Sequence, residues 1–124
     1  MKKKIVKNPA KKVYTLDATG QILGRLASQT AILLLGKNKA SYLPNKLNQD
    51  EVIVKNISKL RFSGKKTEQK KYYHYSGYPG GLKTKKFEEI FAKNPAQIFK
   101  QAVSKMLPKN RLRPKLLKHL KLEN

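Results

Sequence analysis

The chain has 124 residues, with 29 lysines and arginines against 7 aspartates and glutamates, which gives a formal net charge of +22. A chain of this length forms one domain and buries about two-thirds of the surface that its unfolded form exposes. A compact body with so much charge of one sign repels itself unless a polyanion neutralises it, and nucleic acid is the expected polyanion. The composition therefore predicts a protein that binds nucleic acid.

An anionic membrane surface is the rival partner, but the features that membrane attachment requires are missing. The lysine-rich start lacks the apolar segment that would follow in a signal peptide, and the longest strictly apolar run, residues 31–35, is far too short to span a bilayer. The absence of cysteine excludes disulfides and thiolate metal sites, and it fits the cytosol. We therefore expect a soluble cytoplasmic protein with no membrane partner, no small-molecule substrate and no cofactor.

Residues 1–12 contain six lysines and no acid, which predicts a basic N-terminal extension that packs little before it meets phosphate. A solvated tail without a partner is the alternative. No linker or internal repeat divides the rest, so residues 13–124 are predicted to form a single α/β domain.

A strand, a turn and a helix are predicted first in this domain. Residues 13–16 are β-prone, and residues 17–20 carry a turn signal. From Ile22 the apolar residues follow a helical period, and Gly36 is the expected C-terminal stop. The helical stripe consists of Ile22, Leu23, Leu26, Ala27, Thr30, Leu33 and Leu34.

Two glycines at this strand-to-helix junction raise the possibility of a phosphate-binding loop. The spacing argues against it, because Gly24 is followed by Arg25 and Leu26 instead of Lys and Ser/Thr, and a third spaced glycine is missing. We instead expect Gly20 to adopt a left-handed turn and Gly24 to allow close helix–sheet packing.

Two more strands are predicted, over residues 52–54 and residues 60–63. The first of them is a continuous β-branched run and is expected to be buried on both faces. Only five residues separate the two runs, whereas a parallel crossover needs about a dozen or more, so the pairing of these strands stays open.

The remaining segments are predicted to be helical. A short helix around residues 87–91 has Thr84 as a possible N-cap. The next helix starts with Asn94 as cap and Pro95 in the first position, and Pro108 ends it. Its apolar stripe is Ile98, Phe99, Ala102, Val103 and Met106. A last helix is predicted over residues 112–120.

Four of the six tyrosines lie between residues 72 and 78, flanked by lysines and followed by Gly80 and Gly81. Tyrosine and histidine rings stack on unpaired bases, lysines neutralise phosphates, and glycines allow close approach of a strand of nucleic acid. A half-buried strand is the alternative, with Tyr73 as a core candidate, since strands favour tyrosine. The loop from Gly77 to Lys83 is the part that we expect to lie against RNA.

The chain offers little for catalysis. The carboxylates are few, the pairs 50–51 and 88–89 are adjacent and do not converge on one site, and no catalytic motif is present. His74 is the one candidate general base, for a small nuclease, but its nearest acid is Glu68. We expect no enzyme and no metal site.

Several segments together resemble one family, the L-thirteen family of bacterial large-subunit ribosomal proteins. They occur in the family's order and span about residues 13–122: residues 17–27, 36–39 through Tyr42 and Pro44, 52–56, 72–77 leading to Gly80-Gly81, 87–89 and 106–112. The resemblance implies a three-layer α/β/α sandwich with a small, largely parallel four-stranded sheet. It also implies binding to 23S rRNA, neighbouring large-subunit proteins as partners, a role in early subunit assembly and no homo-oligomer.

The chain departs from the family pattern at three places. Leu47-Asn48-Gln49 stands where the family has Asp-Thr-Gly, which puts a local contact in doubt. Arg113-Pro114 replaces Gly-Arg after Leu112, and the family's His-Pro-His-type tail is missing after residue 122.

The leading hypothesis is a structural rRNA-binding protein, and the alternative is a free basic protein that coats DNA or mRNA. The predicted rRNA-binding residues are Arg25, Lys37, Lys39, Lys65, Lys66, Lys70, Lys71, Tyr72, His74, Tyr75, Gly80, Gly81, Lys83, Lys105, Lys109, Arg111 and Arg113.

Overall fold

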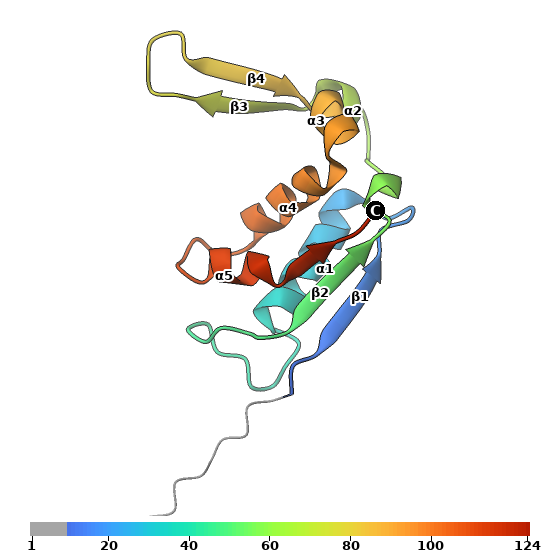
Figure 1. Ribbon diagram of the computed structural model, residues 1–124, viewed down its shortest axis with the longest axis vertical. Coiled ribbons are helices and arrows are strands. Elements are labelled where there is room, and N and C mark those ends of the chain that lie inside the picture. Colours follow the sequence, from blue (N-terminus) through green and yellow to red (C-terminus); the bar gives the residue numbers. More distant parts are fainter. Residues whose placement is uncertain (1–9) are drawn as a thin grey trace, which may run out of the picture.

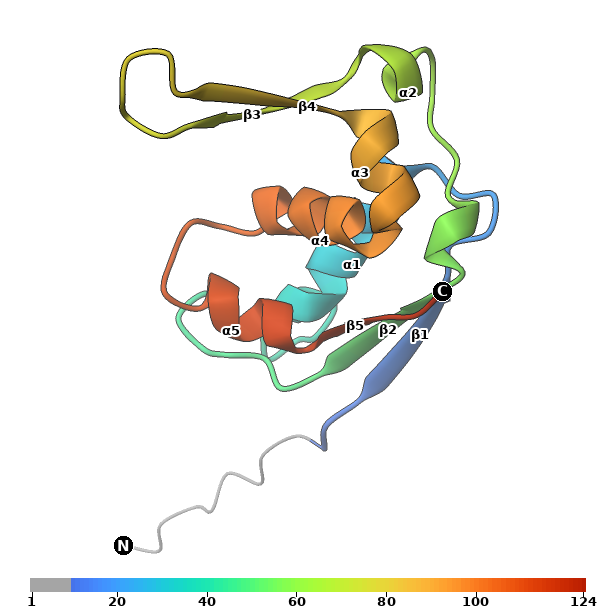
Figure 2. The same ribbon diagram turned by 45° about the horizontal axis from the view of Figure 1, so that its top comes forward.

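The computed structural model describes residues 10–124 of the chain. Within this range a parallel sheet has three strands in the order β1 (Val13–Asp17), β2 (Glu51–Lys55) and β5 (Leu120–Leu122). An antiparallel hairpin is separate from it and consists of β3 (Lys71–Tyr75) and β4 (Leu82–Lys86). Figures 1 and 2 show this hairpin projecting from the body of the domain like an arm.

Helices connect these strands. They are, in chain order, α1 (Leu23–Leu35), α2 (Lys66–Gln69), α3 (Phe87–Lys93), α4 (Pro95–Met106) and α5 (Arg113–Lys118), with a 3-10 turn η1 (Ile57–Lys59) after β2. In residues 10–124, none of them is both long and apolar enough to cross a membrane.

One face of the sheet carries the core. Tyr14, Val52 and Leu120 lie side by side in the parallel register and pack into the core, with Val52 fully buried. On the opposite face Val13 is 55% exposed and Ile53 is only half-buried, so the burial predicted on both faces of β2 is wrong for Ile53. Figure 2 shows α1 and α4 above the same face of the sheet. The domain is thus mixed α/β, and its described part does not confirm the three layers implied by the resemblance.

The number of strands also differs from the prediction. In the part described, residues 60–63 contribute only a single parallel bridge, from Ile22 to Arg61, in place of a fourth strand. The predicted helix over 112–120 ends at Lys118, and residues 120–122 form β5 instead. The main chain changes from helix to strand at this point, because the Val52 N–H donates to the His119 carbonyl at 3.1 Å. This hydrogen bond starts the parallel pairing of β5 with β2.

Helix α1 confirms its prediction. Leu26, Ala27 and Leu34 are buried, and the buried hydroxyl of Thr30 donates to the Leu26 carbonyl at 2.8 Å, which satisfies it inside the core. Gly36 ends the helix with φ of 77°, where its N–H donates to the carbonyls of the last turn.

Helix α4 confirms its start signal and most of its predicted stripe, but Met106 at its end is 41% exposed. The Asn94 side chain accepts from the Gln97 N–H at 3.3 Å, with Pro95 in the first helical position. Ile98, Phe99 and Val103 are buried against the rest of the core. The predicted N-cap at Thr84 is wrong, because that residue lies within β4 and α3 begins only at Phe87.

Candidate nucleic-acid interface

The tyrosine-rich stretch forms the arm. Strands β3 and β4 pair along their full length, from Lys71 opposite Lys86 to Tyr75 opposite Leu82. The connecting loop, residues 76–81, is closed by hydrogen bonds from the Ser76 N–H to the Gly81 carbonyl (3.2 Å) and from the Gly81 N–H to the Tyr78 carbonyl (2.9 Å). Because side chains alternate along a strand, the arm presents two different faces.

Tyr72 anchors the arm to the domain. Its ring stacks on Phe87 at a centroid distance of 6.4 Å, and Phe87 in turn lies edge-on to Phe62 at 4.7 Å. Burial raises the pKa of the Tyr72 phenol above its ordinary value, because burial disfavours the charged form. The prediction of Tyr73 as a core residue is therefore wrong, since its neighbour Tyr72 points to the core and Tyr73 is 66% exposed.

The outer face of the arm is open and carries two tyrosines and a leucine among polar residues. Tyr73, Tyr75 and Leu82 share it, because Tyr75 lies opposite Leu82, and the tyrosines are more than half exposed. Tyr78 in the loop is 74% exposed. Exposed aromatic rings beside lysines are the arrangement on which unpaired bases stack.

The inner face of the arm is basic and overhangs α4. His74, Lys83 and Lys85 line a groove of about 410 Å³ together with Gln97 and Gln101 of α4. Sequence reasoning missed Lys85, although its two-residue spacing from Lys83 on a strand places both on one face. It also missed the two glutamines, because only the fold brings α4 under the hairpin.

Three of the predicted lysines meet at the base of the arm, and they come from different segments. The ammonium groups of Lys70 and Lys105 lie 5.3 Å and 6.0 Å from the centre of the Tyr72 ring. Burial, and then the positive charges of Lys105 and Lys66, lower the pKa of Lys70. We call Lys66, Lys70 and Lys105 the lysine cluster; in residues 10–124 its members have no carboxylate partner. Lys65 and Lys71 are exposed beside it.

Lys39 is placed differently from the other predicted lysines. Its ammonium lies 2.6 Å from Asp50 and 3.2 Å from the Asn48 side-chain oxygen, and the Lys39 side chain is only 17% exposed. Burial alone raises the pKa of Asp50, but the hydrogen bond and charge of Lys39, together with the Lys12 N–H, outweigh it and hold the pKa below its ordinary value. The ion pair thus stabilises the fold here, and rRNA binding by Lys39 stays a prediction.

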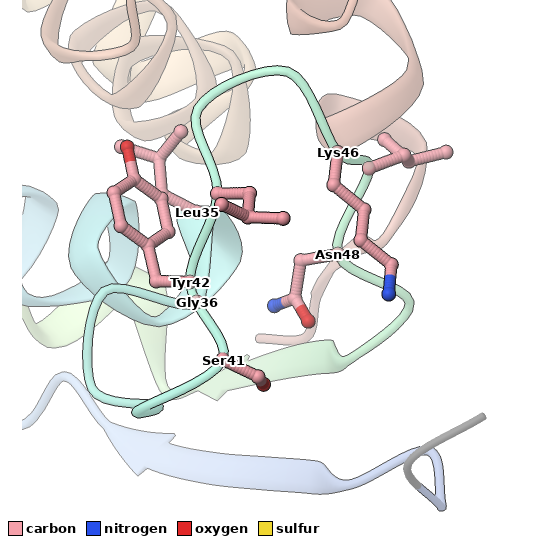
Figure 3. Close-up of a pocket in the computed structure, with 8 residues that line it drawn as sticks. Leu35, Gly36, Ser41, Tyr42, Lys46 and Asn48 are labelled. Carbon is pink, nitrogen blue, oxygen red and sulfur yellow. The ribbon is translucent and has the colours of Figure 1, made fainter. Parts of the chain in front are cut away.

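Asn48 makes a local contact at one of the departures from the family pattern. Its side-chain NH₂ donates to the carbonyls of Leu33 and Leu34 at 3.1 and 3.2 Å, which satisfies the end of α1. Figure 3 shows Asn48 with Gly36 and Lys46 around a hollow in this loop. The hollow has a volume of only about 40 Å³, enough for water but not for a ligand.

The other predicted residues are spread over the surface. Lys37 is exposed just after the end of α1, and Arg25 is exposed on α1. Lys109 and Arg111 are exposed in the loop before α5, where the Asn110 side chain accepts from the Arg113 N–H at 3.1 Å. The basic residues therefore form several groups around the domain, with the lysine cluster and the arm as the densest one.

The turn after β1 is held together by an acidic side chain of the protein itself. The Asp17 carboxylate accepts hydrogen bonds from the Thr19 N–H (3.0 Å), the Thr19 hydroxyl and the Asn56 amide, so an anion of the protein already occupies the turn. These bonds, first that of the Thr19 N–H and then that of Asn56, lower the pKa of Asp17 to about 2. Gly20 has φ of 69°, which confirms its left-handed turn.

The described residues contain no group of three His, Cys, Asp or Glu side chains that could hold a metal ion. The fold and the surface together define a basic α/β protein that presents lysines and aromatic rings on a projecting arm. A sequence model of the family described as Ribosomal protein L13 matches residues 11–122. The chain belongs to this family, which consists of structural proteins and not of enzymes.

Curated relatives agree with this assignment. The chain is 47% identical over 118 residues to the large ribosomal subunit protein uL13 of Pseudothermotoga lettingae, covering 95% of this chain and 80% of the relative. It is 48% identical to uL13 of Chloroflexus aggregans (88% of this chain, 76% of the relative). It is 49% identical to uL13 of Aquifex aeolicus (90% of this chain, 78% of the relative).

Proposed function

We propose that this protein is a structural constituent of the large ribosomal subunit in the cytoplasm, where it binds 23S rRNA, touches neighbouring subunit proteins and helps early assembly. The observation that carries the proposal is the family match over residues 11–122, nearly the whole chain. The relatives named above are large-subunit proteins, and the match reaches across the arm and the lysine cluster.

The mechanism is neutralisation and bridging of RNA. Among the described residues, ion pairs involve only Lys11, Lys39 and Lys121, so most of the cations have no acidic partner in the fold. Basic groups on several sides of a small domain contact phosphates of several rRNA segments at once. Joining segments that repel one another lowers the free energy of the folded RNA. Exposed rings of the arm add stacking on unpaired bases.

Sedimentation of a cell lysate that contains the tagged protein tests the proposed function. We expect the protein to migrate with large subunits and their assembly precursors, and to be removed from that fraction by ribonuclease. Migration only as free protein or with the nucleoid would contradict the proposal and favour a protein that coats DNA or mRNA.

A valine at Gly81 should weaken rRNA binding about tenfold, the loss of one interaction of about 1.4 kcal/mol, and leave the domain folded. A Cβ at this position would collide with the Ser76 hydroxyl and lie 2.9 Å from the Tyr78 carbonyl oxygen, so the loop must change shape. The loop is remote from the Tyr72 anchor, and the core stays intact. Filter binding measures the affinity, and thermal unfolding measures the stability.

Thr84→Val is the matched control for this variant, because it places the same side chain in the same arm at a position where a β-branched residue already lies. It should bind like the unmodified protein. If Gly81→Val unfolded the domain while Thr84→Val did not, the loop would be a structural element and not a contact surface for RNA.

A further inference from the structure

A mainly apolar cavity of about 210 Å³ lies at the base of the arm, next to the lysine cluster. The N-terminus of α1, residues 62–63, α2, the start of α3 and the end of α4 enclose it. Its apolar lining includes Phe62, Phe87 and Met106, and Met106 is 41% exposed. A cavity of about 150 Å³ accommodates benzene in another protein, so this one has room for a planar ring.

Gly24 lines this cavity, and nothing in the fold requires a glycine there. It is the second residue of α1, its φ is not positive, and a Cβ built on it would meet no atom within 4 Å. The prediction that Gly24 permits close helix–sheet packing is therefore wrong. Glycine is unfavourable within helices. At this position the lack of a side chain leaves open space beside the cavity.

The charge around the cavity indicates the chemistry of its ligand. All three members of the lysine cluster line it, and no Asp or Glu of the described residues does so. Their ammonium groups are close enough for Lys66 and Lys105 to disfavour the charge on Lys70, so an anion placed among them would relieve their repulsion. A suitable ligand thus combines an anionic group with a flat apolar one. Three cations at one cavity suit a phosphate better than the single carboxylate of an acidic peptide.

We propose that this cavity receives one unstacked base of the bound RNA, with the adjoining phosphates against Lys66, Lys70 and Lys105. The proposal rests on the proposed function and adds a specific nucleotide subsite to it. Recognition of RNA by proteins commonly uses bases turned out of the stack and packed on aromatic side chains. Here the base enters past Gly24 and packs on Phe62 and Met106.

Filling the cavity from Gly24 tests the proposal with the full-length chain and deproteinised large-subunit rRNA. Gly24→Phe should weaken binding about 5- to 150-fold, the range expected for the loss of one stacked base. Gly24→Ala adds only a methyl group where no atom lies within 4 Å, so it should weaken binding far less than Gly24→Phe. Gln29→Phe places the same ring at an exposed position of α1 outside the cavity and should also leave the affinity unchanged. Thermal unfolding of all three variants should show a folded domain.

A second measurement does not depend on the variants. Irradiation of the unmodified complex with short-wave ultraviolet light, followed by mass spectrometry, should give a nucleotide adduct on a peptide that contains Phe62 or Met106. Unchanged affinity of Gly24→Phe together with the absence of this adduct would overturn the cavity proposal and leave the proposed function intact. Crosslinking of these residues to another polypeptide in intact subunits would overturn it as well. Failure of the unmodified protein to bind rRNA at all would count against the proposed function itself.

Discussion

The affinity of this protein for 23S rRNA should fall about 10³- to 10⁵-fold when the salt concentration rises from about 50 mM to about 200 mM. This range corresponds to about 6 to 10 phosphate contacts, each of which releases a counterion from the RNA. The described surface provides enough cations for that number, since few of them are paired with acids. Filter binding at a series of salt concentrations measures the slope.

Replacing Lys66, Lys70 and Lys105 together with glutamine should make this salt dependence less steep, by roughly one unit of the logarithmic slope for each lost phosphate contact. Lys121→Gln is the matched control, because that ammonium lies 3.0 Å from Glu51 and is already neutralised within the fold. Its slope should equal that of the unmodified protein. An affinity that barely changed with salt would contradict binding through phosphates.

Asp50→Ala should lower the free energy of unfolding by about 3 to 5 kcal/mol, because removal of one partner leaves a charge of a buried ion pair uncompensated. Asp50 is 1% exposed, and it holds both the Lys39 ammonium and the Lys12 N–H. The loss is large against the 5 to 15 kcal/mol that typically stabilises a domain. Urea denaturation of the RNA-free protein measures it.

Glu51→Ala is the control for this effect. Glu51 forms two ion pairs, with Lys11 and Lys121, but the side chains of both lysines are about half exposed. Pairs of this kind contribute at most about 1 kcal/mol each. Equal destabilisation by Asp50→Ala and Glu51→Ala would show that burial of the Lys39–Asp50 pair is not what makes it important.

The features that depend on neighbouring residues could be predicted from the sequence. Helix α1 and helix α4 follow from apolar residues at helical spacing, and their ends follow from Gly36, Asn94 and Pro95. The strand over 13–16 and its turn were predicted for the same reason. The function came from the combination of charge and family resemblance, and the comparisons support it.

The features that depend on distant residues could not be predicted in this way. The leucines at 116, 117 and 120 fit a helical period, so the sequence predicts a helix through residue 120. The strand β5 depends instead on its pairing with β2, which is distant in the sequence. The alternation of side chains along a strand does not show which face of the arm is buried. The face that carries Tyr72 is buried because the Tyr72 ring stacks on Phe87 of α3. The burial of Lys39 depends on Asp50 across the α1–β2 loop.

The lysine cluster and its cavity belong to the same class of features. Lys66 and Lys105 are far apart in the sequence, and only the packing of α2 and α4 around Tyr72 brings them together. Sequence spacing could show that each is basic and exposed, but not that they share one cavity.

We infer that the arm and the lysine cluster hold this protein on the rRNA of the large subunit. Crosslinking within intact subunits, mapped residue by residue, tests it most directly. We predict RNA adducts concentrated in residues 66–86 and 105–113. Adducts confined to the open face of the sheet, at Val13, Thr15 and Lys121, with none on the arm, would contradict the claim.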